Sequence, residues 1–222
     1  YALRTSKTSA KDQTYALYNL TQDQLSKTLV PIGDYEKDEI REIAKKFNIR
    51  VANKPDSQEI CFVSDNDYAS FVENEIGKKM PEGNFVTADG EILGRHKGIL
   101  HYTIGQRKGL GIALGHPIFV TEIRPETNEV VIGENEDVFG YSLEANNLNA
   151  MAVESFFDGM KAIGKIRYSH KGEHCTIKVL GEDRIRIDFD EKVRAITPGQ
   201  AVVLYDESGL VLGGGTIIGR CD

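Results

Sequence analysis

Cys61 is the residue of this chain whose type and setting best suit chemistry. It lies in the apolar run from Ile60 to Val63, which follows the polar run from Asp56 to Glu59. A cysteine at such a boundary can be half exposed and half sheltered, which suits a sulfur nucleophile. Free cysteines are also among the most buried residues, so a structural role in a core is the competing interpretation.

The other two cysteines offer less for chemistry. Cys175 lies in an alternating run that is typical of a strand, where burial is the expected role, and Cys221 stands at the end of the chain. Three distant cysteines without a Cys-x-x-Cys pair indicate neither a disulfide framework nor a zinc ribbon. The His-x-x-Glu-His spacing from His170 to His174 contains Gly172, which predicts a hairpin turn and not a metal-binding helix.

Charge is distributed unevenly along the chain. The 222 residues carry a net charge of -7, which excludes a protein that coats nucleic acid through many unspecific phosphate contacts. Two stretches are nevertheless basic. The first runs from Gly94 to Gly115 without an acid, and the second surrounds Tyr168 with Lys161, Lys165, Arg167, His170 and Lys171. This distribution favours a local, shaped site for a polyanion.

Composition indicates an ordinary globular protein. Hydrophobic residues make up 40% and charged residues 27% of the chain, and no stretch has the apolar length of a membrane span. The segment from Tyr1 to Lys7 is too polar for a signal peptide. We therefore expect a cytoplasmic protein.

The first third of the chain is helical in pattern. Thr21 and Gln24 have the spacing of a capping box, ahead of an apolar run that Pro31 stops. A second helix is predicted from Tyr35 through Phe47, and a third begins at Asp67. Val51 and Ala52 form the only extended piece. So few strands predict that residues 1–75 are the tail of a larger α/β domain.

The rest of the chain is rich in short strands. Asp89-Gly90 predicts a hairpin between residues 84–87 and 91–93, and a second hairpin is predicted from 118 to 133. Further strands are predicted at 161–168, 175–180, 184–189, 201–205 and 210–218. Strands this short and regular favour a small closed barrel. We predict a small β-rich domain over residues 76–140 and a β-barrel over 141–222.

Several segments together resemble the bacterial tRNA-specific 2-thiouridylases. They occur in the family's order and are Lys11 to Tyr15, Asp56 to Phe62, His96 to Gly111, Arg167-Tyr168, Thr197 to Gln200 and Leu212 to Gly215. The resemblance covers essentially the whole chain. It implies the tail of a Rossmann-like ATP-pyrophosphatase (PP-loop) domain, followed by the β-rich middle domain and the carboxy-terminal barrel.

The resemblance also implies an activity and its partners. Such enzymes exchange the 2-oxygen of the wobble uridine, position 34, for sulfur. ATP with Mg²⁺ activates that oxygen, and a persulfide on the cysteine matching Cys61 supplies the sulfur. A second thiol can cleave a persulfide by exchange. The implied partners are the anticodon regions of tRNAs for Lys, Glu and Gln, and a sulfur-relay donor protein.

The tRNA contacts implied by the resemblance fall in two places. Lys11, Asp12 and Gln13 match residues that contact the tRNA near the target base, and Arg167, Tyr168 and Gln200 match residues that contact it from the barrel. The basic segment from 95 to 111 is expected in the middle domain that meets the anticodon stem. No residue of this chain is expected to bind a cofactor or a metal.

The sequence departs from the family's pattern in one respect. The Ser-Gly-Gly-x-Asp-Ser loop that grips ATP, an acid near the target base and the second cysteine do not occur in it. We therefore expect this chain to be inactive by itself. Two alternatives stay open: a non-catalytic RNA-binding module with a structural Cys61, and a cysteine enzyme that acts on an unrelated substrate.

Overall fold

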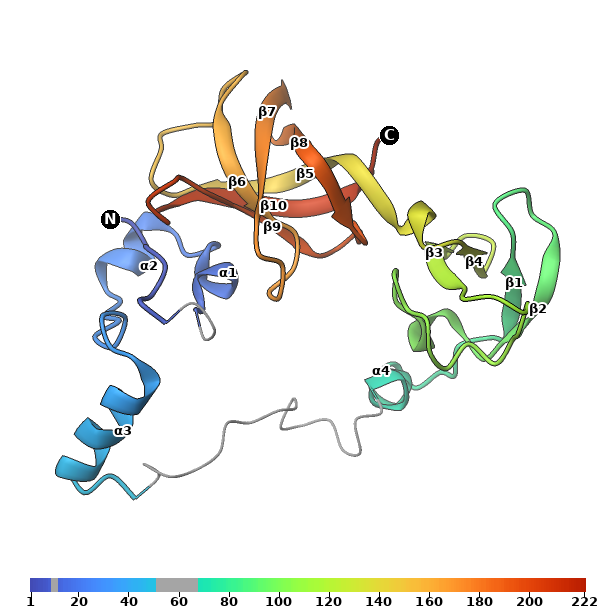
Figure 1. Ribbon diagram of the computed structural model, residues 1–222, viewed down its shortest axis with the longest axis horizontal. Coiled ribbons are helices and arrows are strands. Elements are labelled where there is room, and N and C mark those ends of the chain that lie inside the picture. Colours follow the sequence, from blue (N-terminus) through green and yellow to red (C-terminus); the bar gives the residue numbers. More distant parts are fainter. Residues whose placement is uncertain (9–11, 51–67) are drawn as a thin grey trace. The chain divides into compact units, whose positions relative to one another are not determined.

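The computed structural model describes residues 1–8, 12–50 and 68–222. The chain divides into two compact units, one made of Tyr1–Lys54 with Gly140–Asp222 and the other within Pro55–Phe139 (Figure 1). Lys11, the extended piece at Val51 and Ala52, Cys61 and the helix start at Asp67 lie outside the described residues. The domain boundaries at 75 and 140 stay a prediction.

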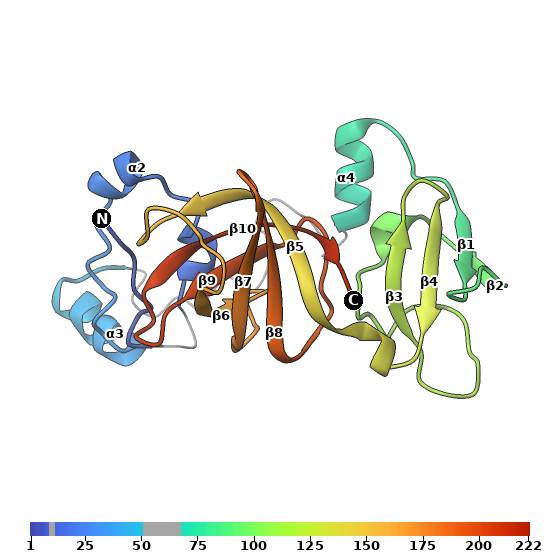
Figure 2. The ribbon, with the colours of Figure 1, turned by 90° about the horizontal axis from the view of Figure 1, so that it is seen from above.

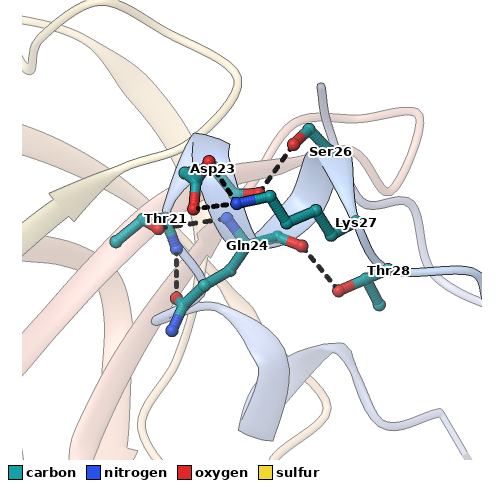
Figure 3. Close-up of polar contacts among 6 residues, drawn as sticks. All are labelled: Thr21, Asp23, Gln24, Ser26, Lys27 and Thr28. Carbon is teal, nitrogen blue, oxygen red and sulfur yellow. Dashed lines mark hydrogen bonds and ion pairs between the residues drawn. The ribbon is translucent and has the colours of Figure 1, made fainter.

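Short helices open the first unit. They are α1 (Thr14–Leu17), α2 (Gln22–Ser26) and α3 (Lys37–Lys46). The capping box is confirmed: the Gln24 amide N–H donates to Thr21 Oγ1 at 3.3 Å, and the Thr21 N–H donates to Gln24 Oε1 at 2.9 Å (Figure 3). Lys27 pairs with Asp23 at 2.8 Å.

Helix α2 ends earlier than the apolar run predicts. The hydroxyls of Ser26 and Thr28 donate to the carbonyls of Asp23 and Gln24, both at 2.7 Å (Figure 3). Side chains that bond to nearby carbonyls compete with continuation of a helix. Leu29, which the pattern includes in the apolar run, is 91% exposed.

The second unit is built on a mixed sheet of four strands, with both antiparallel and parallel pairs. Helix α4 (Tyr68–Ile76) precedes β1 (Gly83–Val86) and β2 (Ile92–His96), and β3 (Phe119–Arg124) and β4 (Glu129–Gly133) complete a sheet of order β2-β1-β4-β3. Both predicted hairpins are confirmed, and β1 runs parallel to β4. Phe85, Val120 and Val130 are fully buried in its core.

The first unit contains a closed six-stranded barrel of order β10-β5-β8-β7-β6-β9, as predicted (Figure 2). Its strands are β5 (Phe139–Ala150), β6 (Lys161–Lys165), β7 (Glu173–Gly181), β8 (Arg184–Arg194), β9 (Ala201–Tyr205) and β10 (Val211–Arg220); the 3-10 turns η3 (Ile99–His101) and η4 (Glu136–Val138) lie in the other unit. The sequence analysis missed β5, because its polar residues, among them Asn146, Asn147 and Asn149, obscure the alternation of its buried positions.

Strand β6 ends at Lys165, so the prediction of a strand through residue 168 is wrong. Arg167 and Tyr168 belong to the turn that leads to β7, and the His170 N–H closes that turn on the Arg167 carbonyl at 3.0 Å. Gly172, with φ of +99°, follows in the same connection. The turn places both side chains at an end of the barrel wall.

The segment before α3 packs onto the barrel (Figure 1). Leu3 and Leu25 share an apolar cluster with Met151, Val203 and Tyr205. Asn149 Nδ2 donates to the carbonyls of Tyr18 and Leu20 at 2.7 and 3.1 Å. The segment that carries α1 and α2 therefore forms one packed body with the barrel.

The glycine run of β10 permits this packing. A Cβ on Gly214 would collide with the carbonyl of Val202 and lie 2.7 Å from the ring of Tyr18. A Cβ on Gly215 would lie 2.7 Å from the carbonyl of Asn146. Real Cβ atoms do not approach other atoms so closely, so both positions require glycine to let β5, β9 and Tyr18 come near.

Candidate functional site

Tyr168 is an exposed member of the predicted barrel site. Its side chain is 48% exposed, and its hydroxyl accepts a hydrogen bond from Gln13 Nε2 at 2.9 Å. Its ring meets that of Tyr15 edge to face, with centroids 6.4 Å apart. Two residues from the helical segment thus fix an aromatic ring that is half open to solvent.

Tyr15 is a supporting residue that the sequence analysis did not single out. Its hydroxyl donates to the carbonyl of Ala201, at the start of β9, at 2.7 Å. Burial raises the pKa of Tyr15 to about 12, so its hydroxyl stays protonated and keeps this bond at neutral pH. Tyr15 therefore links α1, β9 and Tyr168.

Asp12 lies inside the protein, at 8% exposure. Its carboxylate accepts hydrogen bonds from the Ser6 N–H at 2.6 Å, the Thr14 N–H at 3.0 Å and the Thr14 hydroxyl. Thr14 Oγ1 also lies 3.2 Å from the hydroxyl of Tyr205. These bonds fix the backbone on both sides of Gln13. The expected tRNA contact of Asp12 stays a prediction, and its geometry is that of a residue that positions Gln13.

Arg167 is held by the connection between β8 and β9. Its Nη2 donates to the carbonyl of Ala195 at 3.0 Å and to Thr197 Oγ1 at 2.7 Å. Burial, followed by the charge of Arg194, lowers the pKa of Arg167. A guanidinium nevertheless stays charged at neutral pH. The turn therefore fixes a cation that is directly followed by the Tyr168 ring.

Gln200 belongs to the same connection. Its N–H donates to the Thr197 carbonyl at 3.2 Å, and its carbonyl accepts from the Ile217 N–H at 2.8 Å. Gly199, at φ +83°, reverses the chain just before it. The side chain of Gln200 is exposed. Gln13, Arg167, Tyr168 and Gln200 are thus brought together through direct contacts or through the Thr197 turn.

The basic stretch from Gly94 to Gly115 lies in the other unit, and the side-chain amide of Gln106 shapes its loop. Gln106 Oε1 accepts from the Thr103 N–H at 3.0 Å, and Gln106 Nε2 donates to the Lys108 carbonyl at 2.9 Å. Gly105 and Gly109 have positive φ on either side of the exposed Arg107 and Lys108. Gln106 therefore fixes the loop that carries these two cations.

His96 does not contribute to that basic surface, although its type suggests it. It is 2% exposed and packs edge to face against Phe85 and Tyr102. Its Nδ1 accepts from the Gly98 N–H, and its Nε2 lies 3.1 Å from the Asn128 carbonyl. This pattern requires the proton on Nε2. Burial lowers the pKa of His96 and keeps it neutral.

The sequence of this chain is similar to known protein families and proteins. The model of the tRNA methyl transferase HUP domain matches residues 1–65, that of the tRNA methyl transferase PRC-barrel domain matches 69–134, and that of the aminomethyltransferase beta-barrel domain matches 142–217. A tRNA-specific 2-thiouridylase MnmA of Lachnoclostridium phytofermentans is 65% identical over 218 residues, which are 98% of this chain and 61% of that protein. Over nearly its whole length, the chain is similar to the tRNA-specific 2-thiouridylases.

Further 2-thiouridylases show the same extent of similarity. The proteins of that name from Clostridioides difficile and from Clostridium botulinum strain Alaska E43 are 57% and 52% identical over 217 residues, or 98% of this chain and 60% of each relative. The chain thus spans about 60% of the length of the relatives it matches. The resemblance seen in the motifs and the composite fold of HUP-domain part, middle domain and barrel are confirmed.

The cysteines of the described ranges lie outside the Arg167–Tyr168 turn in sequence. Cys175 and Cys221 carry free thiols, and burial raises the pKa of Cys175 to about 12, which confirms its expected place in the core. Residues 1–8, 12–50 and 68–222 hold no cluster of three or more His, Cys, Asp or Glu suited to a metal ion. Within these same described residues, no helix is both long and apolar enough to cross a membrane.

Proposed function

We propose that this chain is part of a tRNA 2-thiouridylase, a sulfurtransferase that exchanges the 2-oxygen of the wobble uridine at position 34 for sulfur. The observation that carries the proposal is 65% identity to a protein of that name over nearly the whole chain. The Arg167–Tyr168 turn supports it independently, because a fixed cation beside an exposed aromatic ring suits single-stranded RNA.

The described residues supply tRNA binding in this proposal. Gln13, Arg167, Tyr168 and Gln200 contact the anticodon region from the barrel unit, with Asp12 supporting Gln13. Arg107 and Lys108 add phosphate contacts from the middle unit. Lys11 and Cys61, which lie outside the described residues, keep their proposed roles as a tRNA contact and as the persulfide carrier. The partners are the tRNAs for Lys, Glu and Gln and a sulfur-relay protein, in the cytoplasm.

ATP with Mg²⁺ is the proposed cofactor, and it supplies activation of the uridine oxygen. The described residues do not fit it. The glycine-rich stretch from 109 to 115 leads into β3 and not into a helix whose N-terminus could hold phosphates. We therefore place the ATP site outside these residues and propose that the chain alone is inactive.

The test of this proposal uses a protein in which this chain is completed to the full length of its relatives. Nucleoside mass spectrometry is applied to tRNA incubated with ATP, a sulfur donor that carries a persulfide, and either the Cys61 protein or its Cys61→Ser form. We expect 2-thiouridine from the former and a loss of at least about 100-fold in the latter, because a hydroxyl cannot carry a persulfide.

Cys175→Ser is the matched control, since Cys175 is buried in the barrel. Equal product from the wild type and Cys61→Ser would remove the carrier role. No product from either, with tRNA binding retained, would favour the non-catalytic RNA-binding module. Thiolation of free uridine at the same rate as tRNA would favour a cysteine enzyme of a different substrate.

A further inference from the structure

Ala195 has a backbone conformation that its residue type rarely adopts. Its φ is +61°, in the left-handed region where the Cβ of any residue other than glycine is crowded. It is 1% exposed and lies beside the buried Val193 and Ile196. Such a conformation persists only where the surroundings enforce it, and it occurs often at functional sites.

The conformation of Ala195 turns its carbonyl toward Arg167. That carbonyl accepts from Arg167 Nη2 at 3.0 Å and from the Thr197 hydroxyl at 3.0 Å. The Thr197 oxygen in turn accepts from the same Nη2 at 2.7 Å. Carbonyl, hydroxyl and guanidinium nitrogen thus form a closed triangle of hydrogen bonds, which sets the plane of the guanidinium.

The triangle orients Arg167 through two uncharged acceptors, the Ala195 carbonyl and the Thr197 hydroxyl. The positive charge of Arg194 also acts on Arg167. Positive charge from two arginines attracts an anion. The backbone phosphate of a nucleic acid is the anion whose geometry a guanidinium matches best.

We propose that Ala195 and Thr197 are positioning residues that aim the Arg167 guanidinium at a phosphate of the bound tRNA, next to the base that stacks on Tyr168. The inference rests on the proposed function, since it assigns a contact within the same tRNA surface. Ala195 and Thr197 thereby act through Arg167 and do not themselves touch the reacting base.

The test measures the affinity of the chain for an unmodified transcript of a tRNA with uridine at position 34, by fluorescence anisotropy. Arg167→Ala is expected to weaken binding about tenfold and to reduce the slope of log affinity against log salt by about 0.7 to 0.9. Thr197→Val removes the hydroxyl at similar volume and should weaken binding about threefold to fivefold. Thr197→Ser keeps the hydroxyl and should restore most of the affinity.

The double variant separates positioning from a general structural role. If Thr197 acts through Arg167, adding Thr197→Val to Arg167→Ala causes no further loss, because the residue being positioned is gone. An equal loss from Thr197→Val in both backgrounds, or no loss in either, overturns the inference. Thermal unfolding of each variant shows that the barrel is intact.

Failure of the proposed function has a different signature. The assignment of this surface to tRNA is wrong if the chain does not bind the transcript, or if Arg167→Ala changes neither the affinity nor the salt slope. In either case the positioning role of Ala195 and Thr197 is wrong as well. If Arg167→Ala weakens binding while Thr197→Val does not, the tRNA surface stands and only the positioning role is wrong.

Discussion

The chain presents positive charge in two units, and the two are built differently. In the barrel unit, the half-buried Arg167 is held by Thr197, and the neighbouring Tyr168 is held by Gln13. In the middle unit, Arg107 and Lys108 are exposed on a loop whose backbone is closed by Gln106. The first arrangement fixes side chains, and the second fixes only the backbone that carries them. We infer that the barrel surface selects the orientation of the RNA, whereas the middle loop contributes attraction.

The largest effect on stability is expected from a substitution that disrupts the packing of the helical segment on strand β10. Gly214→Ala places a Cβ against the Val202 carbonyl and the Tyr18 ring, and should lower the free energy of unfolding of the barrel unit by about 3 kcal/mol. Because Tyr18 shares the helical segment with Gln13, tRNA affinity should fall as well. Amide hydrogen exchange in the two units measures the effect. The exchange rates of β1 to β4 should be the same in the variant and the wild type.

Gly219→Ala is the matched control on the same strand, since no atom lies within 4 Å of a Cβ built there. We expect it to alter the free energy of unfolding by less than about 0.5 kcal/mol. A similar loss from both substitutions would show that β10 tolerates no side chain for reasons other than the approach of Tyr18 and Val202.

An intermediate effect should distinguish the two surfaces by salt dependence. Tyr168→Ala should cost about 1 to 3 kcal/mol of tRNA binding through lost stacking, with an unchanged salt slope. Lys108→Ala should cost less, about threefold in affinity, but reduce the slope by about 0.7 to 0.9. Binding titrations at several salt concentrations provide both quantities. Reversed behaviour of the two slopes would contradict the division into orienting and attracting surfaces.

The smallest effect is a pH dependence confined to the middle unit. The folded-state pKa of His96 lies below its ordinary value of 6.5 because of burial, with a further contribution from Arg95, whereas the Asn128 hydrogen bond acts in the opposite direction. Unfolding raises the pKa and binds a proton, so the stabilisation is complete above pH 6.5 and is lost as the pH falls through the lowered value.

The measurement is hydrogen exchange of β1 to β4 between pH 7 and pH 5, corrected for intrinsic exchange. We expect the free energy of opening to fall with pH in the wild type and to change less in His96→Gln, which cannot take up the proton. The same slope in both proteins would assign the dependence to other groups.

Local patterns predicted local structure well. The Thr21 capping box, the Asp89-Gly90 hairpin and the barrel class follow from residue types within a few positions of one another, and the structure confirms them. Family motifs also identified four of the described residues that the structure gathers around the Arg167–Tyr168 turn. The roles of those residues in binding tRNA stay predictions.

What the sequence could not show depends on distant partners. The contacts of Arg167 with Ala195 and Thr197 arise from the meeting of two connections, and nothing near residue 167 specifies them. The burial of Asp12 and His96 likewise results from tertiary contacts that override the polar character of their types. Gly214 is part of a sequence motif, but only the fold shows why glycine is needed there, because Tyr18 packs against it.

The bond between Gln13 and Tyr168 joins positions 155 residues apart. Closing so long a loop costs chain entropy that only the finished barrel can offset. During synthesis Gln13 emerges long before its partner, and strands β9 and β10 follow later still. We therefore expect the surface around Tyr168 to be among the last parts of the barrel unit to form, so that a nascent or partly folded chain does not yet present the proposed tRNA contacts.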